Sequence, residues 1–172
     1  NDEPASVLLQ KIKAEKEKLG EEGNAKQSKP LPLIKEREIP FEIPENWNWK
    51  YLDDCSTKIT DGEHIRPKIT KNGIYFLSAK DIKEEGVNFE DPLYISEEDS
   101  LKFRNKCNPE EEDILVVSRG ATIGRVCVVD TNKIFCLLGS VILIKPMPSL
   151  DNKYNLYVIK SSYFHKQLIN SS

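Results

Sequence analysis

Three groups of residues are of types that could do chemistry, but their spacing matches no catalytic motif. Cys55 and His64 could pair as a thiol nucleophile and its general base, although nothing in their spacing singles them out. The acidic run 110–113 could hold a nuclease metal ion, but we find no convincing E-x-K arrangement beside it. The run GATIGR at 120–125 fails the spacing of a phosphate-binding loop and lacks its Lys-Ser/Thr ending. We therefore expect no catalytic residues and no cofactor.

The cysteines do not form a metal-binding pattern. They stand at positions 55, 107, 127 and 136, with no C-x-x-C spacing, and the chain has only two histidines. A structural zinc site is therefore not expected. Cys127 and Cys136 lie in apolar runs, which predicts buried, reduced thiols in strands of a cytoplasmic protein.

Length and composition limit the class of protein. The 172 residues, 38% of them apolar, suit one ordinary domain with a modest appendage. No apolar run approaches the roughly 20 residues of a membrane helix. Asp2 and Glu3 stand where a signal peptide would carry lysines. The net charge of −3 argues against a strongly basic nucleic-acid binder, and residues 81–99 carry eight acidic side chains against one basic side chain.

The first part of the chain predicts a helix and a linker. Pro4–Leu19 has a narrow apolar stripe that contains Leu8, Ile12 and Leu19. A stripe this short needs a partner helix to be stable in water, so a frayed tail and a two-stranded antiparallel coil both stay open. Prolines then mark a linker that ends at Pro44.

The remainder predicts an α+β fold with a mixed, twisted β-sheet and flanking helices. Strands are expected at Ile74–Leu77, Asp113–Ser118 and Val141–Lys145. A hairpin is expected from Arg125–Val129 and Lys133–Leu138, and Trp47 and Trp49 should pack in the core or at its edge. A final helix is expected over Tyr154–Ile169. We divide the chain into a coiled-coil-type spacer helix (1–20), a Pro-rich linker (21–46) and a globular domain (47–172).

Two runs in the globular part follow a known family pattern. The run TDGEH at 60–64, Pro67 and the run GIYFLSAKDI at 73–82 are similar to the pattern TDGTH…P…GIPFLSAKDI. In these runs the sequence resembles the specificity subunits of type I restriction–modification systems. The run DILVVSRGATIGR at 113–125 resembles the family segment GDIL…RG…IG, with Glu112 where glycine is usual.

The two ends of the chain add to this resemblance. The run SSYF at 161–164 is similar to the end of the family's terminal helix. Leu8–Leu19, the Pro-rich linker and the run IPFEIPENW at 39–47 resemble the inter-domain spacer helix and its exit into a recognition domain. The resemblance implies one target recognition domain, which reads half of a split double-stranded DNA target without catalysing a reaction. It also implies methyltransferase subunits as partners, a translocating restriction subunit recruited through them, and a second helix beside the spacer helix.

Two segments are our candidates for reading bases. Thr60–Lys68 offers side chains for the major groove, with Gly62 freeing the backbone and Pro67 stiffening it. Asp61 and Gly62 could instead serve the structure. Ser118–Thr122 offers Arg119, which can clamp phosphate or guanine; its alternative is an ion pair with the acidic run 110–113. The predicted DNA-contacting residues are Thr60, His64, Arg66, Lys68, Lys71, Ser78, Lys80, Arg104, Lys106, Ser118, Arg119, Thr122 and Arg125.

Two other classes of function stay open. The chain could be a protein-interaction module that docks partners through residues 4–19 and the acidic segment 81–99. It could also be a hydrolase or nuclease that uses Cys55 with His64, or the carboxylates around Asp113.

Overall fold

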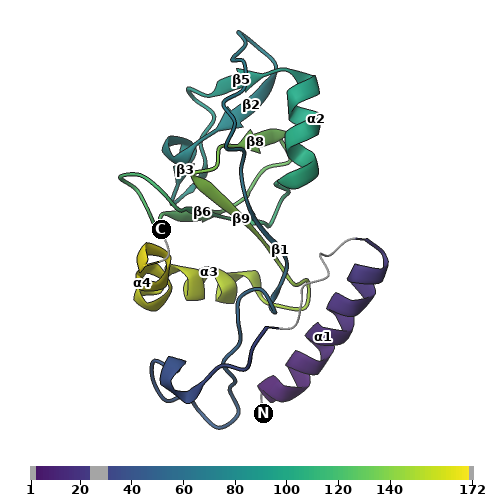
Figure 1. The fold of residues 1–172 in the computed structure, drawn as a ribbon, viewed down its shortest axis with the longest axis vertical. Coiled ribbons are helices and arrows are strands. Elements are labelled where there is room, and N and C mark those ends of the chain that lie inside the picture. The colour runs from purple at the N-terminus through teal and green to yellow at the C-terminus, as the bar shows by residue number, and fades with distance from the viewer. Residues whose placement is uncertain (1–2, 24–30, 171–172) are drawn as a thin grey trace. The chain divides into compact units, whose positions relative to one another are not determined.

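The computed structural model describes residues 3–23 and 31–170, and the chain divides into two compact units (Figure 1). The first unit is formed by Asn1–Lys58 with Pro146–Leu150. The second is formed by Ile59–Lys145 with Asp151–Ser172. Among the described residues, no helix combines the length and the apolarity needed to cross a bilayer.

The expected N-terminal helix is present in the first unit as α1 (Ala5–Glu21). It begins directly after Pro4, whose fixed φ and missing N–H suit this position. Ile12 is buried, while Leu8 and Leu19 are only partly covered, so the stripe is narrow as the sequence indicated. In the described part of the linker, residues 31–46, the only helical element is the 3₁₀ turn η1 (Glu36–Glu38), and there is no strand.

A four-stranded sheet has the order β1-β9-β6-β7. Its strands are β1 (Ser56–Asp61), β9 (Val141–Pro146), β6 (Ile114–Val117) and β7 (Val126–Val128). All four residues of β6 are buried, and β6 pairs antiparallel with both β7 and β9. The run of branched apolar residues in β6 is typical of a strand covered on both faces.

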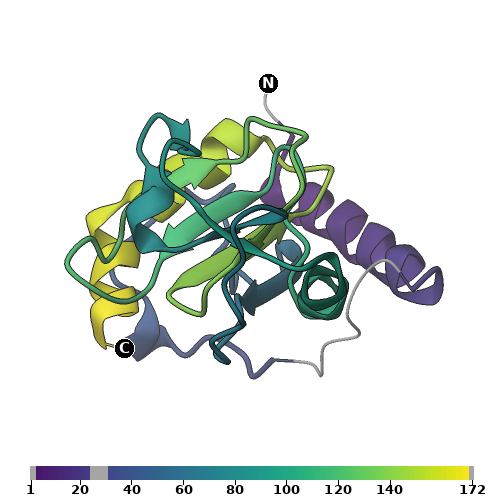
Figure 2. The ribbon, with the colours of Figure 1, turned by 90° about the horizontal axis from the view of Figure 1, so that it is seen from above.

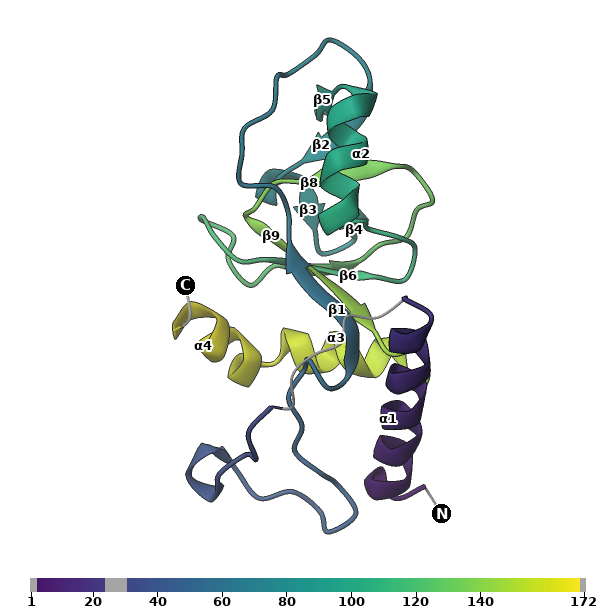
Figure 3. The ribbon, with the colours of Figure 1, turned by 45° about the vertical axis from the view of Figure 1, so that its right-hand side comes forward.

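A three-stranded sheet has the order β5-β2-β8. Its strands are β5 (Leu93–Ile95), β2 (Ile74–Leu77) and β8 (Phe135–Leu137). β8 runs parallel to β2, and β5 runs antiparallel to it. Figures 1 and 3 both show α2 (Glu97–Lys106) along one side of this sheet. The 3₁₀ turn η2 (Ala79–Asp81) and a small pair, β3 (Ile82–Lys83) with β4 (Gly86–Val87), follow β2 along the chain.

The hairpin expected from Arg125–Val129 and Lys133–Leu138 is wrong. β7 pairs with β6 in one sheet, whereas β8 pairs with β2 in the other. The reason is the burial of β8 on both faces. Phe135 and Leu137 pack in the main core, and Cys136 packs in a second cluster with Phe76 and Ile95. A strand buried on both faces fits beside β2 better than at the exposed side of a two-stranded hairpin.

Two features of the helices differ from the expectation. The segment expected as one helix over Tyr154–Ile169 forms α3 (Asn152–Lys160) and α4 (Ser162–Asn170), which Figures 2 and 3 show with separate axes. Ser161 has extended backbone angles, and its hydroxyl accepts a hydrogen bond from Phe164 N at 3.2 Å. The serine therefore ends α3 and caps the start of α4.

Helix α2 is not among the expected elements, because its segment reads as acidic and polar. Ser96 caps it by accepting a hydrogen bond from Asp99 N at 3.1 Å. Three acidic residues occupy its first turn, and Arg104 and Lys106 occupy its last, an order that complements the helix dipole. Capping and charge order were the available sequence signals for this helix.

The expected burial of Cys127 and Cys136 is confirmed, since both are at most 2% exposed. Burial raises the pKa of the Cys127 thiol to about 12. We expect iodoacetamide to leave Cys127 unmodified in the native protein at mildly alkaline pH, and to alkylate all the cysteines once the protein is unfolded, because the thiolate is the reactive form. Peptide mass spectrometry measures the extent of labelling. Rapid native labelling of Cys127 would contradict the buried position.

Candidate nucleic-acid interface

The turn after β1 packs backbone against backbone on the connection between β8 and β9. Gly62 N donates to Val141 O at 3.0 Å, and Glu63 N donates to Leu137 O at 2.7 Å. Gly139 N returns a hydrogen bond to Glu63 O at 2.8 Å. A Cβ at position 62 would stand 2.3 Å from Leu137 O, inside any real contact distance. Glycine is required here by space, so Gly62 has the structural role that the sequence left open.

The same connection also holds the second candidate segment. Ser118 N and Ser118 Oγ both donate to Ser140 O, at 2.9 and 3.2 Å. The structure therefore brings the two segments, which are about 50 residues apart in sequence, against one short piece of chain. We call residues 61–69, 118–122 and 138–140 the recognition edge. The β8–β9 connection is the part that sequence reasoning missed, since its glycine and serine signal only a turn.

Asp61 forms the centre of a polar cluster at this edge. Its carboxylate accepts a hydrogen bond from Lys106 Nζ at 2.7 Å and contacts His64 Nε2. Lys106 Nζ also donates to Gly62 O at 3.0 Å, and the His64 ring lies against Gly139. Partial burial raises the pKa of Asp61, but the hydrogen bonds from Lys106 and His64 outweigh it and hold the pKa below its usual value. The carboxylate thus ties α2 to the recognition edge.

Four of the predicted DNA-contacting cations are exposed: Arg66, Lys68, Lys71 and Arg119. Within residues 3–23 and 31–170, none of the four makes an ion pair or a side-chain hydrogen bond. The alternative for Arg119, an ion pair with residues 110–113, is not formed; Lys145 occupies that position instead. These side chains are available to phosphates or base edges.

The other predicted contacts have partners inside the protein or are partly covered. Lys80 pairs with Asp91 at 2.9 Å, and Ser78 Oγ donates to Asp81 at 3.1 Å. Further internal partners are Asn108 for Arg104 (2.6 Å), Asp61 for Lys106 (2.7 Å), Ile82 O for Arg125 (3.2 Å) and Ser140 O for Ser118. Thr60 and Thr122 are half-buried. A role in DNA contact stays a prediction for each of these residues.

The groups that suggested catalysis are held in structural positions. Burial, followed by the nearby Asp54 carboxylate, raises the pKa of the Cys55 thiol, which opposes nucleophilic reactivity. Lys145 Nζ bridges Glu110 and Asp113 at 2.7 Å each. Across the described part of the chain, no group of His, Cys, Asp or Glu residues has an arrangement that could hold a metal ion.

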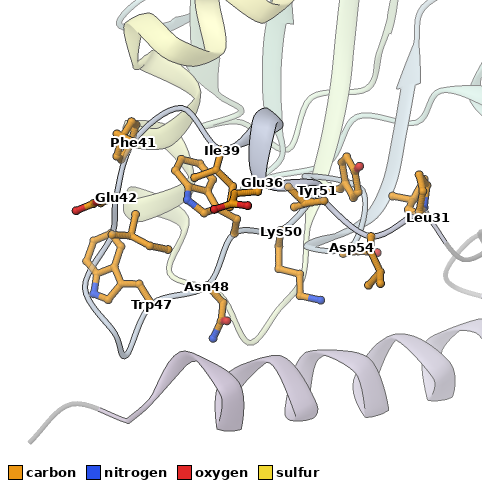
Figure 4. Close-up of a pocket in the computed structure, with 15 residues that line it drawn as sticks. Leu31, Glu36, Ile39, Phe41, Glu42, Trp47, Asn48, Lys50, Tyr51 and Asp54 are labelled. Carbon is orange, nitrogen blue, oxygen red and sulfur yellow. The ribbon is translucent and has the colours of Figure 1, made fainter.

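A separate pocket of about 760 Å³ lies within the first unit (Figure 4). It is lined by the linker and by Trp47 and Trp49, with Phe41 meeting Trp49 edge-on at 5.0 Å between ring centroids. Trp47 is 51% exposed, so it lines this pocket and does not fill a core. Glu36 and Glu42 are among the charged lining residues. A lining of aromatic and aliphatic side chains, with the carboxylates outnumbering the one lysine, Lys50, suits a protein segment better than a phosphate backbone.

The curated proteins that this sequence resembles are specificity subunits of type I restriction enzymes. The specificity subunit of the type I restriction enzyme EcoAI from Escherichia coli is 34% identical over 119 residues, which is 69% of this chain and 20% of that subunit. The EcoEI specificity subunit from the same organism is 49% identical over 69 residues, 40% of this chain and 10% of that subunit. The chain thus spans a fifth or less of the length of these curated relatives. No family model matches it.

Solved structures show the same fold at low sequence identity. The HsdS subunit from Thermoanaerobacter tengcongensis matches 95% of this chain and 37% of its own, with a TM-score of 0.55 and 19% identity. A chain from a structural study of complex assembly and conformational transition in a type I R-M system matches 91% of this chain and 34% of its own, with a TM-score of 0.51 and 20% identity. In sequence the chain is similar to one part of the specificity subunits of type I restriction enzymes, and in fold it matches part of an HsdS subunit.

Proposed function

We propose that this chain is a non-catalytic target recognition module that reads one half of a bipartite DNA sequence for a type I restriction–modification complex. One observation carries the proposal. The β8–β9 connection holds two distant segments at one edge, and these segments present Arg66, Lys68 and Arg119 without partners in the described residues. Loops held on strands are suited to bringing side chains into the major groove, where each base pair differs.

The predicted residues would have two different roles, base contact and phosphate contact. Arg119, beside small residues that permit close approach, fits a bidentate contact to guanine or phosphate. Lys68 and Lys71 fit phosphate contacts, which set the register of the protein on the duplex without reading its sequence. The Asp61 cluster would position the first segment and not contact bases through the carboxylate, because Lys106 and His64 already occupy that carboxylate.

The partners we propose follow from the family. Methyltransferase subunits would clamp the DNA together with this chain and would recruit the translocating restriction subunit. The exposed Trp47 and the acidic lining of the first-unit pocket support a protein contact there. Helix α1 would pack against a second helix of the same subunit or of another copy. The domain boundaries stay as proposed from the sequence, and we infer a cytoplasmic location, where the DNA target lies.

Salt-dependent DNA binding tests this proposal. Because the chain is net acidic, we expect it to bind duplex DNA weakly by itself, in the range of about 10⁻⁴ to 10⁻⁶ M typical of non-specific binding. The double variant Arg66→Ala/Arg119→Ala should weaken binding and lower the slope of log K against log salt by about one for each cation that contacts phosphate. Fluorescence anisotropy over a salt series measures both quantities.

Lys153→Ala is the matched control, since it removes an exposed charge from α3, outside the recognition edge. It should leave the slope unchanged. Equal effects of the two sets of substitutions would remove the recognition edge from the DNA interface.

A pure protein-interaction module is the second candidate, and the first-unit pocket is the observation that favours it. On that account, exchanging the two segments of the recognition edge would leave the DNA sequence preference of an assembled complex unchanged. Trp47→Ala would then abolish assembly with the methyltransferase subunits.

A further inference from the structure

The connection between β1 and β2 exposes a large aliphatic side chain beside unpaired cations. Ile65 is 73% exposed, and it directly precedes Arg66 in the sequence Ile-Arg-Pro-Lys-Ile at 65–69. Figure 3 shows the connection leaving the end of β1 as an open arc. Single exposed apolar residues are common on protein surfaces, so exposure alone indicates nothing. Two further features of Ile65 indicate a binding role, namely its fixed backbone position and its charged neighbours.

The backbone at Ile65 is held in place from two sides. The Glu63 carboxylate accepts hydrogen bonds from His64 N at 2.8 Å and from Ile65 N at 3.0 Å. The Glu63 backbone is itself bonded to the β8–β9 connection, as described above. Ile65 therefore projects from a turn that is anchored to the sheets, and its position does not depend on a contact made by its own side chain.

The chemistry around Ile65 selects one kind of partner. Arg66 and Lys68 lack internal ion pairs in the described residues and attract polyanions, so a purely apolar protein surface is a poor match. The DNA major groove meets both requirements, because it offers phosphates at its walls and one apolar group on its floor, the C5-methyl of thymine. Branched aliphatic side chains have no hydrogen-bonding groups and fit that methyl group.

We infer that Ile65 contacts a thymine methyl in the half-site and so helps to set its sequence. This inference rests on the proposed function and adds a specificity-determining residue to it. It requires the half-site to contain at least one A·T pair whose thymine methyl group contributes to binding.

Replacing thymine by deoxyuridine tests the inference, because it removes only the methyl group. The chain is first placed in a type I specificity subunit, and its half-site is mapped by methylation. Each thymine of that half-site is then replaced in turn, and binding of the assembled methyltransferase is measured. We expect one replacement to weaken binding by about fourfold, the value of one buried methyl group. In the Ile65→Ala variant the same replacement should have no effect.

Leu101→Ala is the matched control, since Leu101 is 67% exposed and lies on α2. This variant should keep the full deoxyuridine penalty. The melting temperature of Ile65→Ala should equal that of the parent, because little of the side chain is buried.

The outcomes separate the two claims. A mapped half-site with no thymine on either strand, or a deoxyuridine penalty equal in parent and variant, overturns the role of Ile65 and leaves the proposed function standing. A complex that assembles and keeps the host's methylation motif overturns the proposed function, and the role of Ile65 with it.

Discussion

Replacing Gly62 by alanine is expected to destabilise the second unit by about 3 kcal/mol or more, as overpacking against fixed atoms does. The new Cβ would stand 2.3 Å from Leu137 O and 2.5 Å from Leu138 O. Both are backbone atoms, so no side-chain rotation relieves the clash. β1 or the β8–β9 connection must move, and the hydrogen bonds of Gly62 and Glu63 to that connection are lost with the movement.

The expected fall in melting temperature is about 6–12 °C, from roughly 2–4 °C per kcal/mol in a chain of this size. Calorimetry or circular dichroism measures it. Gly120→Ala is the control, because Gly120 has a φ of +98° and nothing within 4 Å of the added Cβ. Its cost is backbone strain alone, about 1–2 kcal/mol. A Gly62→Ala protein that melts like the parent would show that the turn does not pack on the connection as described.

Lys145→Met is expected to lower the free energy of unfolding by about 3–5 kcal/mol at neutral pH. This is the usual result of removing one partner of a buried ion pair and leaving the other charge unpaired. Lys145 is 17% exposed and donates to Asp113, whose side chain is 9% exposed. Burial already raises the pKa of Asp113, and Lys145 opposes that rise. Without the lysine, the carboxylate is buried with its main positive partner gone.

The pH dependence identifies the cause of this loss. A carboxyl group with a folded pKa above its unfolded pKa binds a proton more readily when folded, so stability falls as pH rises from the unfolded pKa through the folded pKa. The lysine-free variant raises the folded pKa of Asp113 further. We therefore expect its deficit to be largest at neutral pH and to shrink in mild acid, where Asp113 takes up a proton.

Two comparisons make this prediction specific. Adding Asp113→Asn to the variant should recover much of the loss, because the buried charge is gone. Lys102→Met breaks an exposed pair with Glu98 and should leave the urea midpoint nearly unchanged. Equal urea midpoints for the parent and Lys145→Met, at neutral pH and in mild acid, would mean that the ion pair does not contribute to the stability of the fold.

The fold was predictable from sequence where the signal was local. β2 and β6 come from short runs of aliphatic and aromatic residues, and α1 comes from a proline start and an apolar stripe. The pairing of β8 with β2 was not predictable in this way, because it joins residues about 60 positions apart. Helix α2 has no strong apolar stripe, and only its capping serine and charge order indicate it.

The site was predictable as segments and not as an arrangement. Sequence reasoning proposed both 60–68 and 118–122, but the β8–β9 connection that holds them depends on backbone hydrogen bonds, which every residue type except proline can donate. Sequence reasoning also grouped Lys106 with the cations that would contact phosphate. The ion pair between Lys106 and Asp61 depends on α2 reaching the end of β1, and this tertiary contact has no local sequence signal.

The most direct test of the central claim is to transfer the chain into the second recognition position of a working type I specificity subunit. The transferred segment should include all of residues 1–172, since a cut near Pro44 would divide the first compact unit. Sequencing then maps adenine methylation by the assembled complex. We expect one half of the split methylation motif to change while the other half is kept. A complex that assembles and continues to methylate the old motif would contradict the claim that this chain reads DNA.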